Sequence, residues 1–217
     1  MVHIHRIGSG NVNCYIVADR DKAILIDTGR KKYREKILEK CKEFQVRLIV
    51  LTHGHMDHCQ NAAYLANALN IPVAMSKKDS NLIPDNRKQK MSAKTLLGKI
   101  VLLVSLSSFE KDTLDVFKPM VYLQDGDNLK EYGVDATVVA LPGHTEGSVG
   151  LEIEGDKLFV GDALMNMFYP TISMLYTDKD KMLESAKRIG EMGAKTIYFG
   201  HGKPKRNRKW VIHHLSE

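Results

Sequence analysis

Four side chains that can bind a metal ion lie within six residues of one another in the stretch THGHMDH: His53, His55, Asp57 and His58. Imidazole and carboxylate groups are ligands suited to zinc, iron or manganese. Four ligands packed so densely cannot easily all serve a single ion. The spacing therefore favours two adjacent metal ions, and the chemistry of such a site is the activation of water for hydrolysis.

Three further candidate ligands follow apolar, strand-like runs much later in the chain: His144 in LPGHTEGSVG, Asp162 in LFVGDAL and His201 in TIYFGHG. A glycine stands immediately before each of them. Ligands at strand ends are fixed by the sheet, and glycine lets a metal and a substrate approach the backbone closely. We therefore expect these residues to join the first cluster at one edge of a sheet.

Strands and helices in alternation must position these ligands, because aliphatic runs alternate with segments whose apolar residues recur at helical spacing. Strands are predicted over residues 2–7, 13–19, 22–28, 46–52, 71–76, 120–129, 135–142, 147–155, 157–162 and 196–201. Helices are predicted over residues 29–44, 59–70, 91–109 and 178–193. Mixed elements with buried strand runs indicate an α/β layered fold. Residues 1–217 are predicted to form a single domain.

The composition is that of a globular protein, since 43% of the 217 residues are hydrophobic and 27% are charged. The N-terminus, MVHIHRIGSG, does not resemble a signal peptide, and the longest strongly apolar run, IVLLVSL, is far too short to cross a membrane. The three cysteines are widely spaced and odd in number, which fits reduced thiols. We therefore expect a soluble, cytoplasmic protein without membrane contact.

The HxHxDH signature at residues 53–58, followed in order by the three later ligands, resembles the metallo-β-lactamase superfamily. The stretch IDTG, residues 26–29, also looks like the early Asp-Thr-Gly motif of that superfamily. GHTEGSVG and FVGDAL are similar to its compact, glyoxalase-II-like branch. The resemblance runs from about residue 10 to residue 205. It implies a four-layer αββα sandwich with the metals at one edge of the two sheets.

The resemblance also implies roles for the candidate ligands. Carried over position by position, it gives two ligand sets and one bridge: His53, His55 and His144; Asp57, His58 and His201; and Asp162 between them. Two divalent ions are implied, with Zn²⁺ favoured and Fe or Mn as alternatives. A hydroxide bridging the metals would attack the substrate, and Asp57 would orient it as the catalytic carboxylate. Asp27 would support the loop beside the metals.

The middle segment, residues 77–119, changes character and separates two halves that each contain strands followed by a helix and a strand. It is predicted to form a helical insertion or lid. Its apolar part, residues 91–109, has two interpretations. It is a packing helix of the core or of a homodimer contact, or it is an apolar wall that admits a substrate with an apolar portion. The net charge of +6, with Lys203 and Lys205 near His201, is compatible with an anionic small-molecule substrate.

Hydrolysis of a small carbonyl substrate is the leading functional prediction, with a thioester or another ester or lactone favoured. The chain ends soon after His201, without the C-terminal helical region with which glyoxalase II enzymes grip glutathione, so a glutathione thioester is not assumed. A phosphodiesterase or RNA nuclease of the same fold is the first alternative. The sequence shows no Gly- and basic-rich RNA-gripping insertion, so nucleic acid is not an expected partner. A mononuclear iron persulfide dioxygenase, with only His, His and Asp as ligands, is the second alternative.

Overall fold

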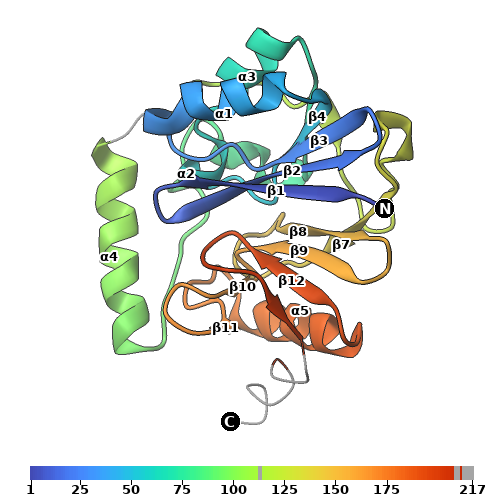
Figure 1. Ribbon diagram of the computed structural model, residues 1–217. Helices are drawn as coiled ribbons and strands as arrows, with labels where there is room; N and C mark the ends of the chain where they lie inside the picture. The colour runs from blue at the N-terminus through green and yellow to red at the C-terminus, as the bar shows by residue number, and fades with distance from the viewer. Residues whose placement is uncertain (112–113, 208–210, 212–217) are drawn as a thin grey trace.

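Two β-sheets packed face to face form the centre of the molecule (Figure 1). The computed structural model describes residues 1–111, 114–207 and 211. Side chains from both sheets, including Ile24, Leu48 and Phe159, are buried between them. Each such side chain contributes about 1.5–3 kcal/mol when it leaves water. Helices cover the outer face of each sheet, so the predicted four-layer αββα sandwich is confirmed.

The first sheet has six strands in the order β1-β2-β3-β4-β5-β6. Their bounds are β1 His3–Ser9, β2 Val12–Asp19, β3 Lys22–Ile26, β4 Gln45–Val50, β5 Val73–Met75 and β6 Val121–Tyr122. The first three strands are antiparallel because only tight turns separate them, with positive φ angles of 73° at Gly10 and 54° at Arg20. From β3 to β6 the strands are parallel, since longer connections with helical segments join them.

The second sheet has five strands in the order β13-β12-β9-β8-β7. Their bounds are β7 Ala136–Ala140, β8 Val149–Ile153, β9 Lys157–Gly161, β12 Thr196–Phe199 and β13 Lys205–Arg206. β12 runs parallel to β9 after a crossover through a helix. A small antiparallel pair, β10 Leu164–Met165 and β11 Thr171–Ile172, lies between β9 and that helix in the chain, where the sequence predicted no strand.

Helices form the two outer layers and one side of the molecule (Figure 1). Their bounds are α1 Arg34–Lys42, α2 Met56–Cys59, α3 Ala62–Leu69, α4 Leu96–Lys111 and α5 Lys179–Glu191, with 3-10 turns η1 Lys31–Tyr33, η2 Lys77–Leu82 and η3 Lys130–Tyr132. α1 and α3 cover the first sheet, and α5 covers the second. α5 begins after Asp178, whose carboxylate accepts hydrogen bonds from the backbone N–H groups of Asp180 and Lys181.

Residues 77–119 connect β5 to β6, and their main element, α4, stands alongside the sandwich (Figure 1). The sequence predicted a helix from Met91, but α4 begins at Leu96. The reason is that Ser92 instead pairs with Tyr176 through two backbone hydrogen bonds of 2.8 and 3.0 Å. Leu103 and Val104 of α4 are 69% and 67% exposed, so the interpretation of a core helix is wrong. No helix among the described residues has the length and apolar character to cross a lipid bilayer.

Candidate metal centre

The stretch from His53 to His58 forms the turn between β4 and α2 and the beginning of that helix. His53 and His55 precede the helix, whereas Asp57 and His58 lie on it. His55 has an extended backbone with φ of −71° and ψ of 144°, so the chain changes direction there before α2 starts. The sequence therefore presents two ligands from a strand-end loop and two from a helix start.

The other three predicted residues follow strands of the second sheet. His144 comes after β7, Asp162 after β9 and His201 after β12. A backbone hydrogen bond of 2.8 Å from Gly200 to Gly161 holds the last two strand ends side by side. The structure brings all seven predicted residues together at one edge of the sandwich. Six of them are buried, and Asp57 keeps 19% of its side chain exposed.

The candidate ligand atoms form three groups, and two of these share no residue and contain the residues of the two predicted sets. In each group, three atoms lie within 4.8 Å of one another. The first of these two groups is His53, His55 and His144, and the second is Asp57, His58 and His201. The remaining group, His53, His58 and Asp162, overlaps both. In the first, His55 Nδ1 faces His144 Nε2 at 2.9 Å, and in the second, His58 Nε2 faces His201 Nε2 at 3.4 Å. Imidazole nitrogens at such distances have the arrangement that a shared cation requires.

Asp162 lies between the two groups. Its Oδ2 is 3.7 Å from His144 Nε2 in the first group and 3.2 Å from His201 Nε2 in the second. Its Oδ1 lies 3.5 Å from His58 Nε2. One carboxylate thus reaches both groups, which is the position that a bridging ligand needs.

Four of the histidines have their second ring nitrogen fixed by a hydrogen-bond partner. His53 Nδ1 lies 3.0 Å from Thr52 Oγ1, and His58 Nδ1 lies 2.9 Å from Asp27 Oδ2. The remaining partners are the backbone carbonyl of Leu175 for His144 Nδ1, at 2.9 Å, and that of Asn11 for His201 Nδ1, at 2.8 Å. Such contacts set the tautomer and turn the opposite nitrogen toward the cluster.

Residues 7–201 of the chain match the family model described as "Metallo-beta-lactamase superfamily". The chain belongs to this superfamily. An uncharacterized protein of Aquifex aeolicus is 32% identical to it over 170 residues, which are 74% of this chain and 72% of that protein. Hydroxyacylglutathione hydrolase 1 of Vibrio vulnificus is 29% identical over 188 residues. That match covers 86% of this chain, but the chain spans only 60% of the length of the Vibrio protein.

The crystal structure of the B3 metallo-beta-lactamase BLEG-1 has the same fold. It superimposes with a TM-score of 0.75 and covers 99% of this chain and 98% of its own. The two sequences are 22% identical, so this likeness bears on the fold alone.

The electrostatics of the cluster are governed by burial and by the mixture of imidazoles and carboxylates. Burial, reinforced by the neighbouring histidines, lowers the pKa of His53 and brings that of His55 to about 3. Burial also disfavours the charged form of His58, but Asp162, Asp57 and Asp27 outweigh it and raise its pKa to about 10. For Asp162, burial opposes ionisation, yet His201 and His58 keep the pKa well below the usual range. The cluster thus holds neutral imidazoles at His53 and His55, a protonated imidazole at His58 and an ionised carboxylate at Asp162.

The donor set of this superfamily member fits divalent metal ions. Among the described residues, the buried atoms His53 Nε2 and Asp162 Oδ1 have no hydrogen-bond partner, although an unmet buried polar atom is costly. Gly200 leaves the space beside them open, because a Cβ there would collide with Asp162 Oδ1 and His58 Cε1. A metal ion bound in this open space would give these unpartnered ligand atoms a partner.

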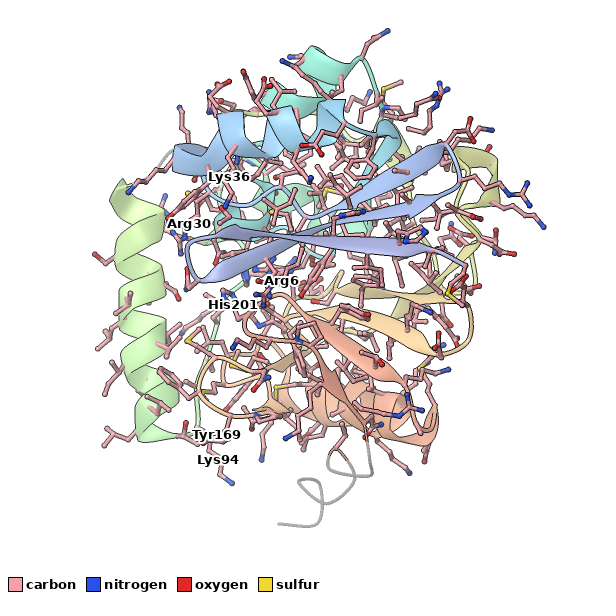
Figure 2. All side chains as sticks on the ribbon, viewed as in Figure 1. Arg6, Arg30, Lys36, Lys94, Tyr169 and His201 are labelled. Carbon is pink, nitrogen blue, oxygen red and sulfur yellow. The ribbon has the colours of Figure 1, made fainter. Side chains whose placement is uncertain are left out.

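A cleft with a volume of about 310 Å³ opens over the cluster. The side chains on its floor are His55, Asp57, His144, Asp162 and His201. α4 forms one wall, and the β10–β11 region forms another. Figure 2 shows Arg30 on the side of the first sheet and Tyr169 at the opposite end, with His201 between them. The candidate metal ligands are therefore accessible to a small molecule.

The supports of the HxHxDH loop include residues that sequence reasoning missed. Asp79 Oδ2 accepts a hydrogen bond of 2.9 Å from the backbone N–H of Gly54. Asn86 Oδ1 accepts one of 2.6 Å from the N–H of Met56. Both supports come from the polar part of the middle segment, KKDSNLIPDNRKQK, where nothing distinguishes them from the other acidic and amide residues. Lys203 and Lys205, considered for an anionic substrate, are exposed and do not line the cleft.

Proposed function

We propose that this chain is a dinuclear metal-dependent hydrolase that cleaves a small carbonyl substrate, with a thioester favoured and another ester or lactone next. The observation that carries this proposal is the pair of adjacent three-ligand groups with Asp162 between them. The similarity to a hydroxyacylglutathione hydrolase supports a thioester. Because the chain spans only part of the length of that relative, we do not extend the proposal to a glutathione thioester.

The proposed ligand roles follow the two groups. His53, His55 and His144 would hold one ion, Asp57, His58 and His201 would hold the other, and Asp162 would bridge them. When bound, such ions polarise a carbonyl oxygen and lower the pKa of a water molecule toward neutrality. The donor set suits zinc, which we favour, with iron or manganese as alternatives.

Asp57 is the residue that we assign to orienting the attacking water. Its carboxylate reaches the cleft, and its Oδ2 lies 3.6 Å from both His201 Nε2 and Arg30 Nη2. Burial would raise the pKa of Asp57, but His58 and His201 outweigh it and lower that pKa. An ionised carboxylate at this position can accept a hydrogen bond from the water and keep its lone pair aimed at the carbonyl carbon.

A small molecule is the substrate class that the cleft favours. Among the described residues, Arg30 is the one lysine or arginine that lines it, whereas RNA requires several cations along its phosphates. Residues 77–119 would act as the cover of this cleft within a single domain of residues 1–217. A cytoplasmic location belongs to the same proposal, since Cys14, Cys41 and Cys59 are buried free thiols.

Metal analysis combined with turnover tests the proposal. The protein is loaded with zinc, and its metal content is measured together with the hydrolysis of an acyl thioester. About two zinc ions per chain and thioester hydrolysis are expected. Asp162→Asn should lose a metal ion and lower turnover by roughly a hundredfold or more. His3→Ala is the matched control, because His3 lies exposed on β1 and should leave both readouts unchanged.

Three outcomes would overturn the proposal. One iron per chain with oxygen consumption and no hydrolysis would identify a mononuclear dioxygenase. Cleavage of RNA or of a phosphodiester without hydrolysis of any carboxylic ester or thioester would identify a phosphodiesterase or RNA nuclease of the same fold. Full turnover of Asp162→Asn would contradict the dinuclear mechanism even if hydrolysis itself were observed.

A further inference from the structure

The cleft over the cluster has an apolar wall made by two segments that are far apart in the sequence. From α4 come Leu97, Ile100, Val101 and Val104, at the spacing of one helix face. From the β10–β11 region and the chain after it come Met165, Met167, Phe168 and Leu175. The two sets line the same cleft as the candidate ligands, so apolar surface lies directly beside the reacting centre.

Several of these apolar side chains remain exposed to solvent. Ile100, Val104 and Phe168 are 53%, 67% and 63% exposed, respectively. Apolar side chains that converge around one cleft while still exposed do little for the stability of the chain alone, and they mark a binding site. The methionines add an adaptable surface, because an unbranched thioether side chain fits ligands of different shape.

The two walls are joined, so the apolar surface exists before a ligand binds. The backbone pairing of Ser92 with Tyr176 links the chain before α4 to the chain after β11. At Gly98 the first turn of α4 approaches the carbonyl of Met174 so closely that a Cβ would lie 3.0 Å from that oxygen. A site built on joined elements loses little entropy when it binds its ligand.

The opposite end of the cleft is polar. Arg30 lines it there and lies 3.6 Å from Asp57. Figure 2 places Arg30 on the first-sheet side of His201, while Lys94 and Tyr169 lie at the far end, where the chain enters α4. The cleft therefore has an apolar end and a polar end, and the candidate metal ligands lie between them.

From this division we infer that the substrate carries an apolar acyl chain, which lies between α4 and the β10–β11 region with its carbonyl over the cluster. The leaving group extends toward Arg30 and is polar. This inference rests on the proposed function, and it adds the substrate class of that site. It makes α4 a specificity element: the helix selects the acyl group by burying it.

The first test measures kcat/KM for thioesters of one thiol with straight acyl chains of increasing length, from acetyl to octanoyl. Each added methylene should raise kcat/KM about fourfold until the wall is covered, since each buried methylene adds a fixed increment of hydrophobic free energy. The second test needs no turnover. Binding of acetate, hexanoate and octanoate is measured by calorimetry on the zinc-loaded and the metal-free protein, and octanoate should bind most tightly in both forms.

Two neighbouring residues of α4 provide a matched pair of variants. Val104 lines the cleft and Leu103 does not, yet their exposures of 67% and 69% are nearly equal. Val104→Asp should weaken octanoate binding roughly tenfold or more and leave acetate unchanged, because it places a charge against the chain. Leu103→Asp should change neither. Phe168→Ser, on the opposite wall, should weaken octanoate binding in the same way as Val104→Asp. Because it leaves α4 intact, it excludes a disturbed helix as the cause of the weaker binding.

The outcomes separate this inference from the proposed function. Thioester hydrolysis with no dependence on chain length would overturn the apolar acyl site while leaving a hydrolase in place. Equal binding of acetate and octanoate, or equal losses in Val104→Asp and Leu103→Asp, would also overturn it. The protein could instead select octanoate, lose that selectivity in Val104→Asp and hydrolyse no ester. That result would support the apolar site and contradict the proposed hydrolase function.

Discussion

The buried carboxylate of Asp79 accepts a hydrogen bond of 2.7 Å from the hydroxyl of Thr145, 66 residues further along the chain. The same oxygen accepts the N–H of Gly54, and the other oxygen accepts that of Gly147 at 2.7 Å. Gly54 lies between His53 and His55, and Thr145 follows His144. One side chain from the connecting segment thus holds both loops that carry the first ligand group.

Asp79→Asn should loosen that group. The amide has the size of the carboxylate but presents N–H donors where four donors converge, so at least one of them loses its acceptor. We expect the free energy of unfolding to fall by roughly 3 kcal/mol, and the zinc content to drop toward one ion. Chemical denaturation of the metal-free protein and elemental analysis of the loaded protein measure these two quantities.

Asp85→Asn is the control for Asp79→Asn. Asp85 lies in the same segment and is paired with Arg87 in solvent, so its replacement should leave the free energy of unfolding almost unchanged. Two zinc ions and unchanged unfolding in Asp79→Asn would show that Asp79 does not position the ligand loops.

That the seven candidate ligands gather at one place was predictable from the sequence, because their signals are local. An aliphatic run followed by glycine and then by His144, Asp162 or His201 is visible in a few letters. Strand ends meet at the edge of a sheet, so placing each ligand at a strand end was enough to expect them together. The four-layer architecture followed from the resemblance to the family.

The supports and the cleft wall could not be predicted in the same way, because they depend on contacts between distant segments. Nothing near Asp79 indicates that it meets Thr145. The pairing of Ser92 with Tyr176 could not be foreseen either, and because of it α4 begins at Leu96 and not at Met91. An apolar helix pattern also does not say which of its faces will cover a cleft.

Gly200→Ala should remove metal from the second group. A Cβ at this position would collide with Asp162 Oδ1 and His58 Cε1, and both atoms belong to candidate ligands. Metal content should fall below two ions per chain, and thioester turnover should fall with it. Gly8→Ala is the control, because no atom lies within 4 Å of a Cβ built there. A Gly200→Ala protein with two ions would show that the space beside His58 is not needed.

Metal binding should release a proton from His58. Burial lowers the pKa of this imidazole, but the three surrounding carboxylates outweigh it and raise the pKa to about 10, so the metal-free protein keeps the proton at pH 8. A metal ligand must be neutral, and the proton therefore competes with the ion. Affinity for zinc should rise by about tenfold per pH unit between pH 7 and pH 9 and level off above about pH 10.

Calorimetric titration with zinc at pH 8, in two buffers of different ionisation enthalpy, counts the released protons. At least one proton per chain is expected, and His3→Ala should leave the count unchanged because His3 lies outside the cluster. Identical heats in the two buffers would contradict a protonated His58.

Asp27→Asn should weaken metal binding without disturbing the backbone. Asp27 Oδ2 lies 2.9 Å from His58 Nδ1, and its Oδ1 accepts the N–H of Thr52 at 2.8 Å. Its φ of 58° is left-handed, a conformation that asparagine tolerates well, so the fold should survive. The variant loses the charge that orients His58, and zinc affinity should fall roughly 10- to 100-fold. Competition with a chromophoric chelator measures this, with Asp156→Asn as control, because the Asp156 carboxylate is 56% exposed and pairs with Lys157. Equal affinities in the two variants would show that Asp27 does not tune the second ligand group.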